Sequence, residues 1–264
     1  MISNKGVQAD FAERAARICE KDDDVVGLTA GGSWLKNEID EFSDLDLILV
    51  SKQKISGNKE KMLSYAVGLG TLLSAFTGEH IGDKRVLICL YDNPLLHVDI
   101  KFLTIEEFSS RVESPFLLLD KGGELKKVIN STVAGFPLPD FQWIEDRFWV
   151  WIHYVLTKIG RGEYFESVDF FASLRAYVFG PMLHIKVHSE PRGVRKLEFI
   201  SADEDIGLLK ATLPEYSKQS LLRSVENSVL LYRKLRLELY TGKISLKKEA
   251  EEKVMHYFDE ISSK

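Results

Sequence analysis

The spacing of hydrophobic residues changes along the chain and divides it into two halves. Up to about residue 135, short apolar runs alternate with polar breaks, which is typical of strands and helices mixed in one domain. From residue 142 onward apolar side chains recur every three or four residues, as at Ile144, Phe148 and Trp151, which predicts amphipathic helices. We therefore expect an α+β fold with two domains, residues 1–135 and 136–264.

Local signals predict a mixed β-sheet flanked by helices, followed by an all-α helical bundle. Thr104 and Glu107 have the spacing of a capping box, and the sequence Asp-Asn-Pro at 92–94 predicts a turn between two strands. The expected elements are a helix over 7–20, strands over 25–30 and 43–50, a helix over 60–76, strands over 84–91 and 95–103, a helix from 104, a strand over 116–119, and helices from 142, around an interruption near 180–181, over 218–240 and over 245–261.

Two aspartates lie close together in a strongly apolar strand signal. Asp44 and Asp46 fall within the run 43–50, Ser-Asp-Leu-Asp-Leu-Ile-Leu-Val. Residues two apart on a strand share a face, so both carboxylates should point the same way, about 7 Å apart. Carboxylates among such neighbours have to be paired or bound to a cation. The alternative, an acidic pair on a solvated edge strand, is weaker because strands disfavour aspartate.

A third carboxylate and a glycine turn accompany this pair. Asp99 lies between two apolar residues on a later strand signal, where the alternative is a surface residue paired with Lys101. Gly31, Gly32 and Ser33 stand ten residues before the first aspartate. Glycines let the backbone approach phosphate oxygens, and the serine offers a hydroxyl and an N–H. Three hard oxygen donors beside such a turn suit Mg²⁺ carrying a nucleoside triphosphate.

The order Gly-Ser, Asp-hydrophobic-Asp and then hydrophobic-Asp-hydrophobic resembles the polymerase-beta-like nucleotidyltransferase superfamily. Within it, residues 26–102 are most similar to aminoglycoside nucleotidyltransferases of the streptomycin adenylyltransferase type. A weaker similarity continues in the second half, at Arg147-Phe148-Trp149 and over 158–164. At one position the chain departs from the pattern, because Trp34 follows the motif serine where those enzymes usually have arginine. Streptomycin itself is therefore expected to be a poor acceptor.

The resemblance implies a Mg²⁺-dependent enzyme that transfers a nucleoside monophosphate, AMP from ATP in the first instance, to a hydroxyl group of an aminoglycoside-type small molecule. It implies that Asp44 and Asp46 bind the metal. It also implies that Asp99 ligates a second metal or takes the proton of the attacking hydroxyl. The glycine turn would bind the triphosphate, and the helical domain would complete the substrate cleft.

Four residues are candidates for contact with the acceptor. Trp34 lies in the loop nearest the phosphates, where it would contact base, sugar or acceptor. Glu163, Glu166 and Asp169 lie where the helical domain of the enzymes resembled faces the cleft. For each of these three taken singly, a solvated helix-surface charge is the simpler explanation. Together they would give an acidic cleft, which favours hydroxylated, amine-bearing acceptors whose binding weakens as salt rises.

Composition narrows the partners and the compartment. The 264 residues are 45% hydrophobic and 28% charged, which is ordinary for a globular protein. A net charge of −5 argues against nucleic acid as the main partner, because phosphate neutralisation needs a basic surface. Cys19 and Cys89 are expected to be buried thiols in a reducing compartment. Since residues 1–6 lack an apolar signal core, we expect a cytoplasmic protein without membrane partners, either a monomer or a homodimer.

Two other functions are compatible with the same residues. One is a non-catalytic nucleotide-binding or antitoxin-like regulatory module, which would have no need for three converging carboxylates. The other keeps nucleotidyl transfer but uses a protein side chain as the acceptor.

Overall fold

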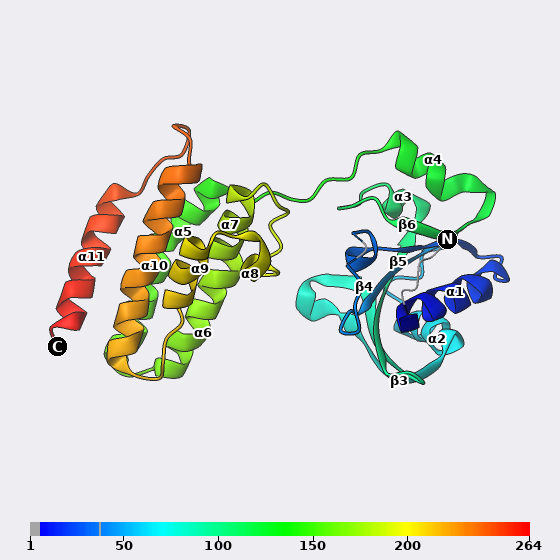
Figure 1. The fold of residues 1–264 in the computed structure, drawn as a ribbon, viewed down its shortest axis with the longest axis horizontal. Coiled ribbons are helices and arrows are strands. Elements are labelled where there is room, and N and C mark those ends of the chain that lie inside the picture. The colour runs from blue at the N-terminus through cyan, green and yellow to red at the C-terminus, as the bar shows by residue number, and fades with distance from the viewer. Residues whose placement is uncertain (1–5, 37) are drawn as a thin grey trace. The chain divides into compact units, whose positions relative to one another are not determined.

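The computed structural model describes residues 6–36 and 38–264 (Figure 1). The predicted lack of an apolar leader concerns mainly residues 1–5, which lie outside the described residues. The chain forms two compact units, Met1–Phe136 and Pro137–Lys264. Among the helices described, none combines the length and apolar character needed to cross a membrane.

The N-terminal unit is built on a mixed sheet. Its described part contains six strands in the order β3-β4-β5-β2-β1-β6, antiparallel except for the central parallel pair β2 and β5. The α+β fold predicted from the sequence is thus confirmed. The strands are β1 (Val25–Ala30), β2 (Leu45–Ser51), β3 (Thr71–Gly78), β4 (Asp83–Asp92), β5 (Leu96–Thr104) and β6 (Phe116–Asp120), and the helices are α1 (Gly6–Glu20), α2 (Lys59–Leu69), α3 (Ile105–Phe108) and α4 (Glu124–Ser131).

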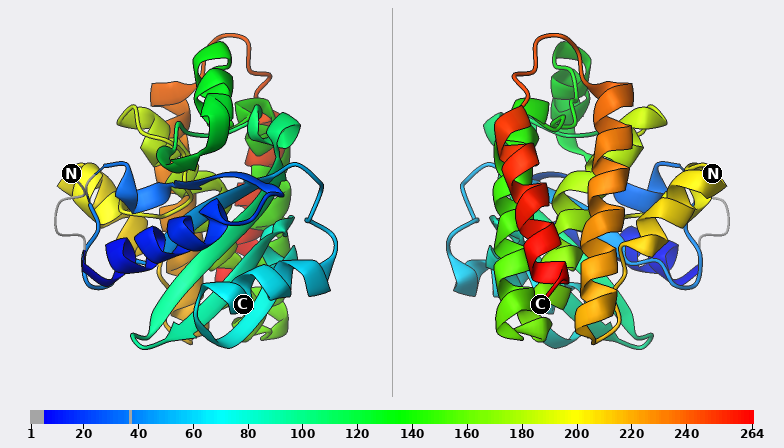
Figure 2. Two further views of the ribbon diagram at one scale, coloured as in Figure 1. Left: turned by 90° about the vertical axis from the view of Figure 1, so that its right-hand side faces the viewer. Right: turned by 90° about the vertical axis from the view of Figure 1, so that its left-hand side faces the viewer.

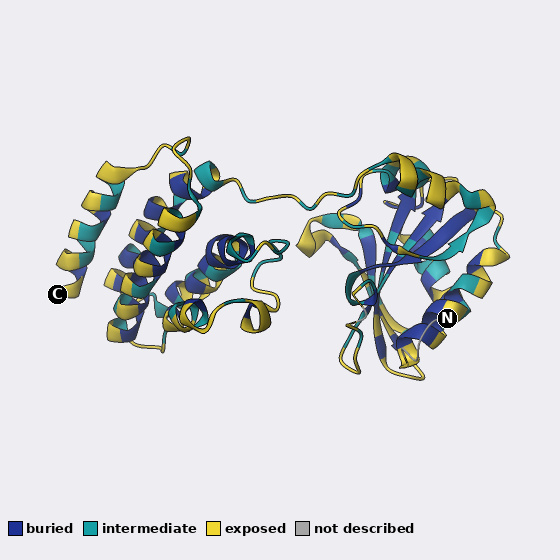
Figure 3. Ribbon diagram, turned by 45° about the horizontal axis from the view of Figure 1, so that its top comes forward, coloured by how far each residue is buried: buried dark blue, intermediate teal, exposed yellow. Residues whose placement is uncertain are grey.

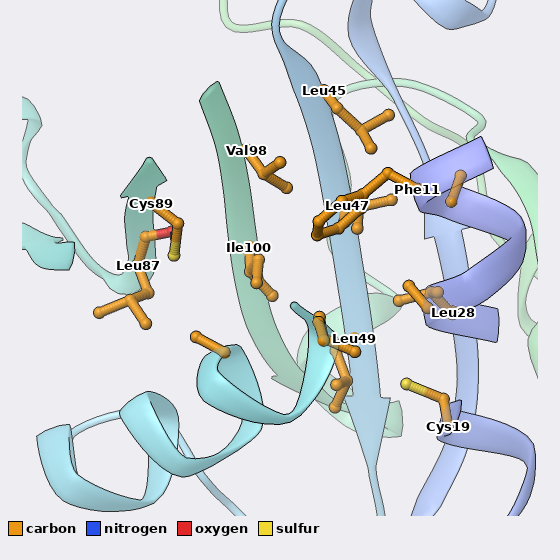
Figure 4. Packing of buried hydrophobic residues seen from close by; sticks show 14 of the residues in the cluster. Phe11, Cys19, Leu28, Leu45, Leu47, Leu49, Leu87, Cys89, Val98 and Ile100 are labelled. Carbon is orange, nitrogen blue, oxygen red and sulfur yellow. The ribbon is translucent and has the colours of Figure 1, made fainter. Parts of the chain in front are cut away.

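The main core of this unit lies between the sheet and the helices α1 and α2 (Figure 2, left). Leu45, Leu47 and Leu49 of β2 are at most 1% exposed. They point toward the helix side, where Phe11 and Cys19 of α1 meet them (Figure 4). Because side chains alternate along a strand, the residues between these leucines face the other side of the sheet.

The opposite face has a smaller apolar core, to which α3 and α4 contribute. Val50, Leu103, Phe108 and Leu125 are buried there. The capping box predicted at the start of α3 is present, with Thr104 and Glu107 bonded reciprocally. This second core covers only one end of the face, because β2 and β5 change from apolar to acidic toward their N-terminal ends.

The helix predicted over 60–76 is wrong in its second part. The helix α2 ends at Leu69, and β3 follows at once and pairs with β4. Gly70 separates them in an extended conformation, and a side chain there would come within 3.3 Å of the Tyr91 ring. Glycine is a poor helix former, and the pairing with β4 outweighs the helix-like spacing of the leucines that follow.

The C-terminal unit is helical, as predicted. The helix α5 contacts α6, α10 and α11, and buried residues form stripes along α5 and α10 (Figures 2 and 3). The interruption predicted near 180–181 is a π-helical turn, Arg175–Phe179, between α6 and α7. The helices α4, α8 and α9 were not predicted. The helices of this unit are α5 (Phe141–Arg161), α6 (Tyr164–Leu174), α7 (Gly180–Lys186), α8 (Leu197–Ile200), α9 (Asp203–Ala211), α10 (Lys218–Leu239) and α11 (Lys248–Ser262).

One carboxylate is fully buried inside the helical unit. Glu145 is 0% exposed and accepts hydrogen bonds from the Tyr232 hydroxyl at 2.6 Å and from the backbone N–H of Lys247 at 2.8 Å. Arg236 lies 3.5 Å away as a counter-charge. A buried carboxylate needs such partners, so this network joins α5, α10 and the start of α11.

Candidate functional site

Two of the three predicted aspartates sit side by side on the central parallel strands. In the register of β2 and β5, Asp46 is the partner of Asp99. Leu45 and Leu47 flank Asp46, and Val98 and Ile100 flank Asp99, and all four point to the main core (Figure 4). Strand alternation therefore places both carboxylates on the opposite face of the sheet.

The third aspartate lies just outside this pair. Asp44 immediately precedes β2 and is half-buried. Burial raises the pKa of Asp99, and the negative charge of Asp44 raises it further. The ring Nε2 of His97 lies 2.9 Å from Asp99 Oδ1 and acts in the opposite direction on that pKa. The structure thus brings Asp44 into electrostatic range of Asp99, although 55 residues separate them in the chain.

The glycine turn lies directly against the aspartate pair. The backbone N–H of Gly31 donates to the carbonyl oxygen of Asp46 at 3.0 Å. Gly32 has φ +61°, a conformation that favours glycine, and a Cβ there would lie 2.1 Å from Asp46 Oδ2. No other residue fits at position 32 unless the Asp46 carboxylate moves.

A fourth carboxylate, Glu113, reaches the same turn and was not predicted. Its Oε1 accepts the backbone N–H of Gly32 at 2.8 Å. A Cβ at Gly31 would lie 2.8 Å from that oxygen, so the glycine pair is enclosed by carboxylates of Asp46 and Glu113. The local sequence Val-Glu-Ser-Pro carries no motif, and only the fold brings this residue to the turn.

The residues after the glycine pair have different surroundings. Ser33 is half-buried, within a 3₁₀ turn over Gly32–Trp34. Trp34 is only 3% exposed and belongs to the main core, with its ring centroid 6.0 Å from that of Phe116. In this conformation Trp34 packs inside the unit, and its predicted contact with an acceptor stays a prediction.

A buried glutamine holds the loop that leads into the aspartates. Gln8 of α1 is 5% exposed, and its side-chain amide donates to the backbone carbonyls of Asp40 at 3.1 Å and Ser43 at 2.8 Å. These bonds fix the chain just before Asp44. No sequence signal points to this role, because a single glutamine in a helix is ordinary.

Two of the three acidic candidates of the helical unit form ion pairs with one lysine. Lys158 Nζ lies 2.7 Å from Glu163 and 2.9 Å from Glu166. Glu166 also accepts the hydroxyl of Tyr154, and the hydrogen bonds from Tyr154 and Lys158 lower the pKa of Glu166. Asp169 is exposed on α6. Whether these three acids contact an acceptor stays a prediction.

The residues around the turn fit a magnesium ion that arrives with a nucleotide. Within residues 6–36 and 38–264, no three His, Cys, Asp or Glu side chains form a ready-made metal-binding group. Mg²⁺ is commonly held by one or two carboxylates together with substrate phosphates, instead of by a cage made of protein alone. Asp46 and Asp99 supply donors of that kind in register on one face, and Asp44 lies in electrostatic range of Asp99.

Comparison with known proteins adds little to this picture. No protein-family model matches the sequence, and no curated protein matches it. Among solved structures, the chain is similar to an aminoglycoside 6-adenyltransferase from Bacillus subtilis, with 14% identity and a TM-score of 0.41 over 98% of this chain and all of the other. A similarity at this level does not establish an activity.

Proposed function

We propose that the protein is a nucleotidyltransferase that moves a nucleoside monophosphate, AMP from ATP in the first instance, onto a hydroxyl of a small molecule. The observation that carries the proposal is the pairing of Asp46 with Asp99 on one face of the sheet. A glycine turn lies against this pair, and a side chain at position 32 would collide with the Asp46 carboxylate. Two carboxylates in register on neighbouring strands repel each other, and such an arrangement is favourable once a cation binds between them.

In this proposal each residue has a separate task. Asp44 and Asp46 hold Mg²⁺, which neutralises phosphate charge when it is bound. The glycine turn and Ser33 bind the phosphates of the nucleotide. The acceptor oxygen forms a bond to the α-phosphorus, the bond from that phosphorus to the bridging oxygen breaks, and pyrophosphate leaves. Asp99, in register with Asp46, takes the hydroxyl proton.

The acceptor we propose is hydroxylated and amine-bearing. Glu163, Glu166 and Asp169 would attract its positive charges. Because Lys158 already neutralises two of them, an acceptor amine would replace the lysine there instead of filling an open acidic site. Trp34 would enter the site only if its ring left the core.

The decisive experiment combines nucleotide binding with turnover. Thermal stability is measured with ATP and Mg²⁺, followed by pyrophosphate release against a panel of aminoglycosides, lincosamides and amine-free polyols. Asp46→Asn should abolish release and leave the fold intact. Asp92→Asn, which removes the same charge at the exposed end of β4, should behave like the wild-type protein. Full turnover by Asp46→Asn would exclude the site, whereas stabilisation by Mg·ATP without turnover on any acceptor would favour a nucleotide-binding module.

A further inference from the structure

The Gly32 amide that the proposed function assigns to phosphate already has an anionic partner. Glu113 Oε1 lies 2.8 Å from the Gly32 nitrogen, a normal hydrogen-bond distance. A carboxylate oxygen and a phosphate oxygen are acceptors of the same kind, and both bind backbone N–H groups strongly when charged. One N–H cannot form a full hydrogen bond to both.

We propose that Glu113 occupies the place of a phosphate oxygen in the nucleotide-free protein and competes with the nucleotide for the Gly32 amide. This inference rests on the proposed function, because it takes the glycine turn as the phosphate site. Glu113 acts here as an internal competitor that sets how tightly the nucleotide binds, and it takes no part in the chemical step.

The charge around the turn supports this role. The carboxylate of Asp46 borders Gly32, and that of Glu113 borders Gly31. An incoming triphosphate would therefore meet two negative charges at adjacent residues. Metal binding offsets the first, since Asp46 is a proposed ligand. The second is relieved only when Glu113 moves away, because like charges at hydrogen-bond distance raise the free energy of the complex.

The backbone that carries Glu113 is held on both sides, so the side chain is the part that moves. On one side Arg111 is 9% exposed and donates to the carbonyl oxygens of Ile129 at 3.1 Å and Thr132 at 3.0 Å. On the other side Phe116 starts β6 and pairs with Ala30, next to the glycine turn. Rotation of the glutamate side chain frees the amide without moving the segment.

The test compares Glu113→Ala and Glu113→Gln with the wild-type protein and with Glu106→Gln. Glu106 is an exposed glutamate of α3, so its variant removes the same charge without touching the turn. Binding of Mg·ATP is measured by calorimetry. We expect Glu113→Ala to bind about tenfold more tightly, equivalent to about 1.4 kcal/mol. Glu113→Gln, which keeps an acceptor but loses the charge, should fall between, and Glu106→Gln should match the wild-type protein.

A second measurement does not depend on nucleotide. In ¹⁵N-glycine spectra of the full chain, the Gly32 amide should shift in Glu113→Ala and stay in place in Glu106→Gln. An unmoved amide would overturn the inference. If the wild-type protein binds Mg·ATP and Glu113→Ala binds it equally or more weakly, the inference is also overturned. The proposed function still stands in that case. If neither the wild-type protein nor any variant binds Mg·ATP, the proposed function fails, and the competitor role fails with it.

Discussion

Replacement of Gly32 by alanine should separate the effect of backbone strain from the effect of moving a site carboxylate. An L-residue at φ +61° lies in the left-handed region, which costs about 1–2 kcal/mol in backbone strain. The new Cβ would lie 2.1 Å from Asp46 Oδ2 and 3.2 Å from its Cγ. The short side chain of Asp46 can turn away from the new Cβ, but the strained rotamer that results costs about 0.5–1.5 kcal/mol. We expect a total loss of about 1.5–3.5 kcal/mol in the free energy of unfolding.

Gly82→Ala provides the matched control for this prediction. Gly82 has φ +80°, and no atom lies within 4 Å of its added Cβ, so that variant carries the backbone strain alone. Both variants can be unfolded in urea and followed by ¹⁹F spectra of 5-fluorotryptophan, because Trp34 is the one tryptophan before residue 137. Gly32→Ala should be the less stable by about 1 kcal/mol and should lose the proposed nucleotidyl transfer, while Gly82→Ala keeps it. If the two variants have equal stability and equal activity, the position of the Asp46 carboxylate against the glycine turn is not required.

Three further predictions concern pairs of charged or polar groups. Tyr232→Phe should destabilise the helical unit by about 1–3 kcal/mol in urea unfolding, because buried Glu145 loses a donor; an unchanged midpoint would contradict this. Hydrogen bonds from Arg85 hold the pKa of Asp83 well below its ordinary 3.8, so this carboxylate adds stability that is present above that value and lost as pH falls through the lower folded pKa. Asp83→Asn should therefore be about 1 kcal/mol less stable at neutral pH, and the deficit should shrink in acid; a constant deficit in pH-dependent unfolding would count against the pairing. Lys158→Met leaves Glu166 without its cation and Glu163 with only Arg161, 3.8 Å away, and should tighten the binding of a polycationic acceptor in low-salt calorimetry; weaker binding would remove these glutamates from the proposed acceptor site.

The faces of the strands and the spacing of the acidic residues could be predicted from the sequence, because both depend on local periodicity. Alternation of leucine and aspartate over 43–50 was enough to place Asp46 away from the core. The register that pairs Asp46 with Asp99 is set by contacts between strands that are distant in sequence. The motif therefore indicated that the two aspartates lie close together, but it did not predict that they are direct partners. Gly70 is a case in which local spacing misled. The spacing of apolar residues predicted a helix that continues through Gly70, whereas the chain changes there from helix to strand.

Residues that reach the site from outside the motifs had no sequence signal. Glu113 reaches Gly32 because β6 pairs beside β1, and Gln8 reaches the loop before Asp44 because α1 packs across the sheet. Neither residue lies in a motif, and a polar side chain in a loop or helix is usually solvated. Trp34 illustrates the same limit, because its position after the motif serine suggested contact with a ligand but gave no sign that the ring packs against Phe116 and is buried.

The parallel pairing of β2 and β5 has a consequence for how the protein is made. Parallel neighbours cannot be joined by a tight turn, and here α2, β3 and β4 lie between them in the chain. During synthesis, a chain that has emerged only as far as β4 holds Asp46 but lacks its partner strand. Such contacts between distant segments form late, because loop closure has to come first. The acidic pair would then form only after β5 has joined β2, so the binding proposed for it could not begin on a partly made chain.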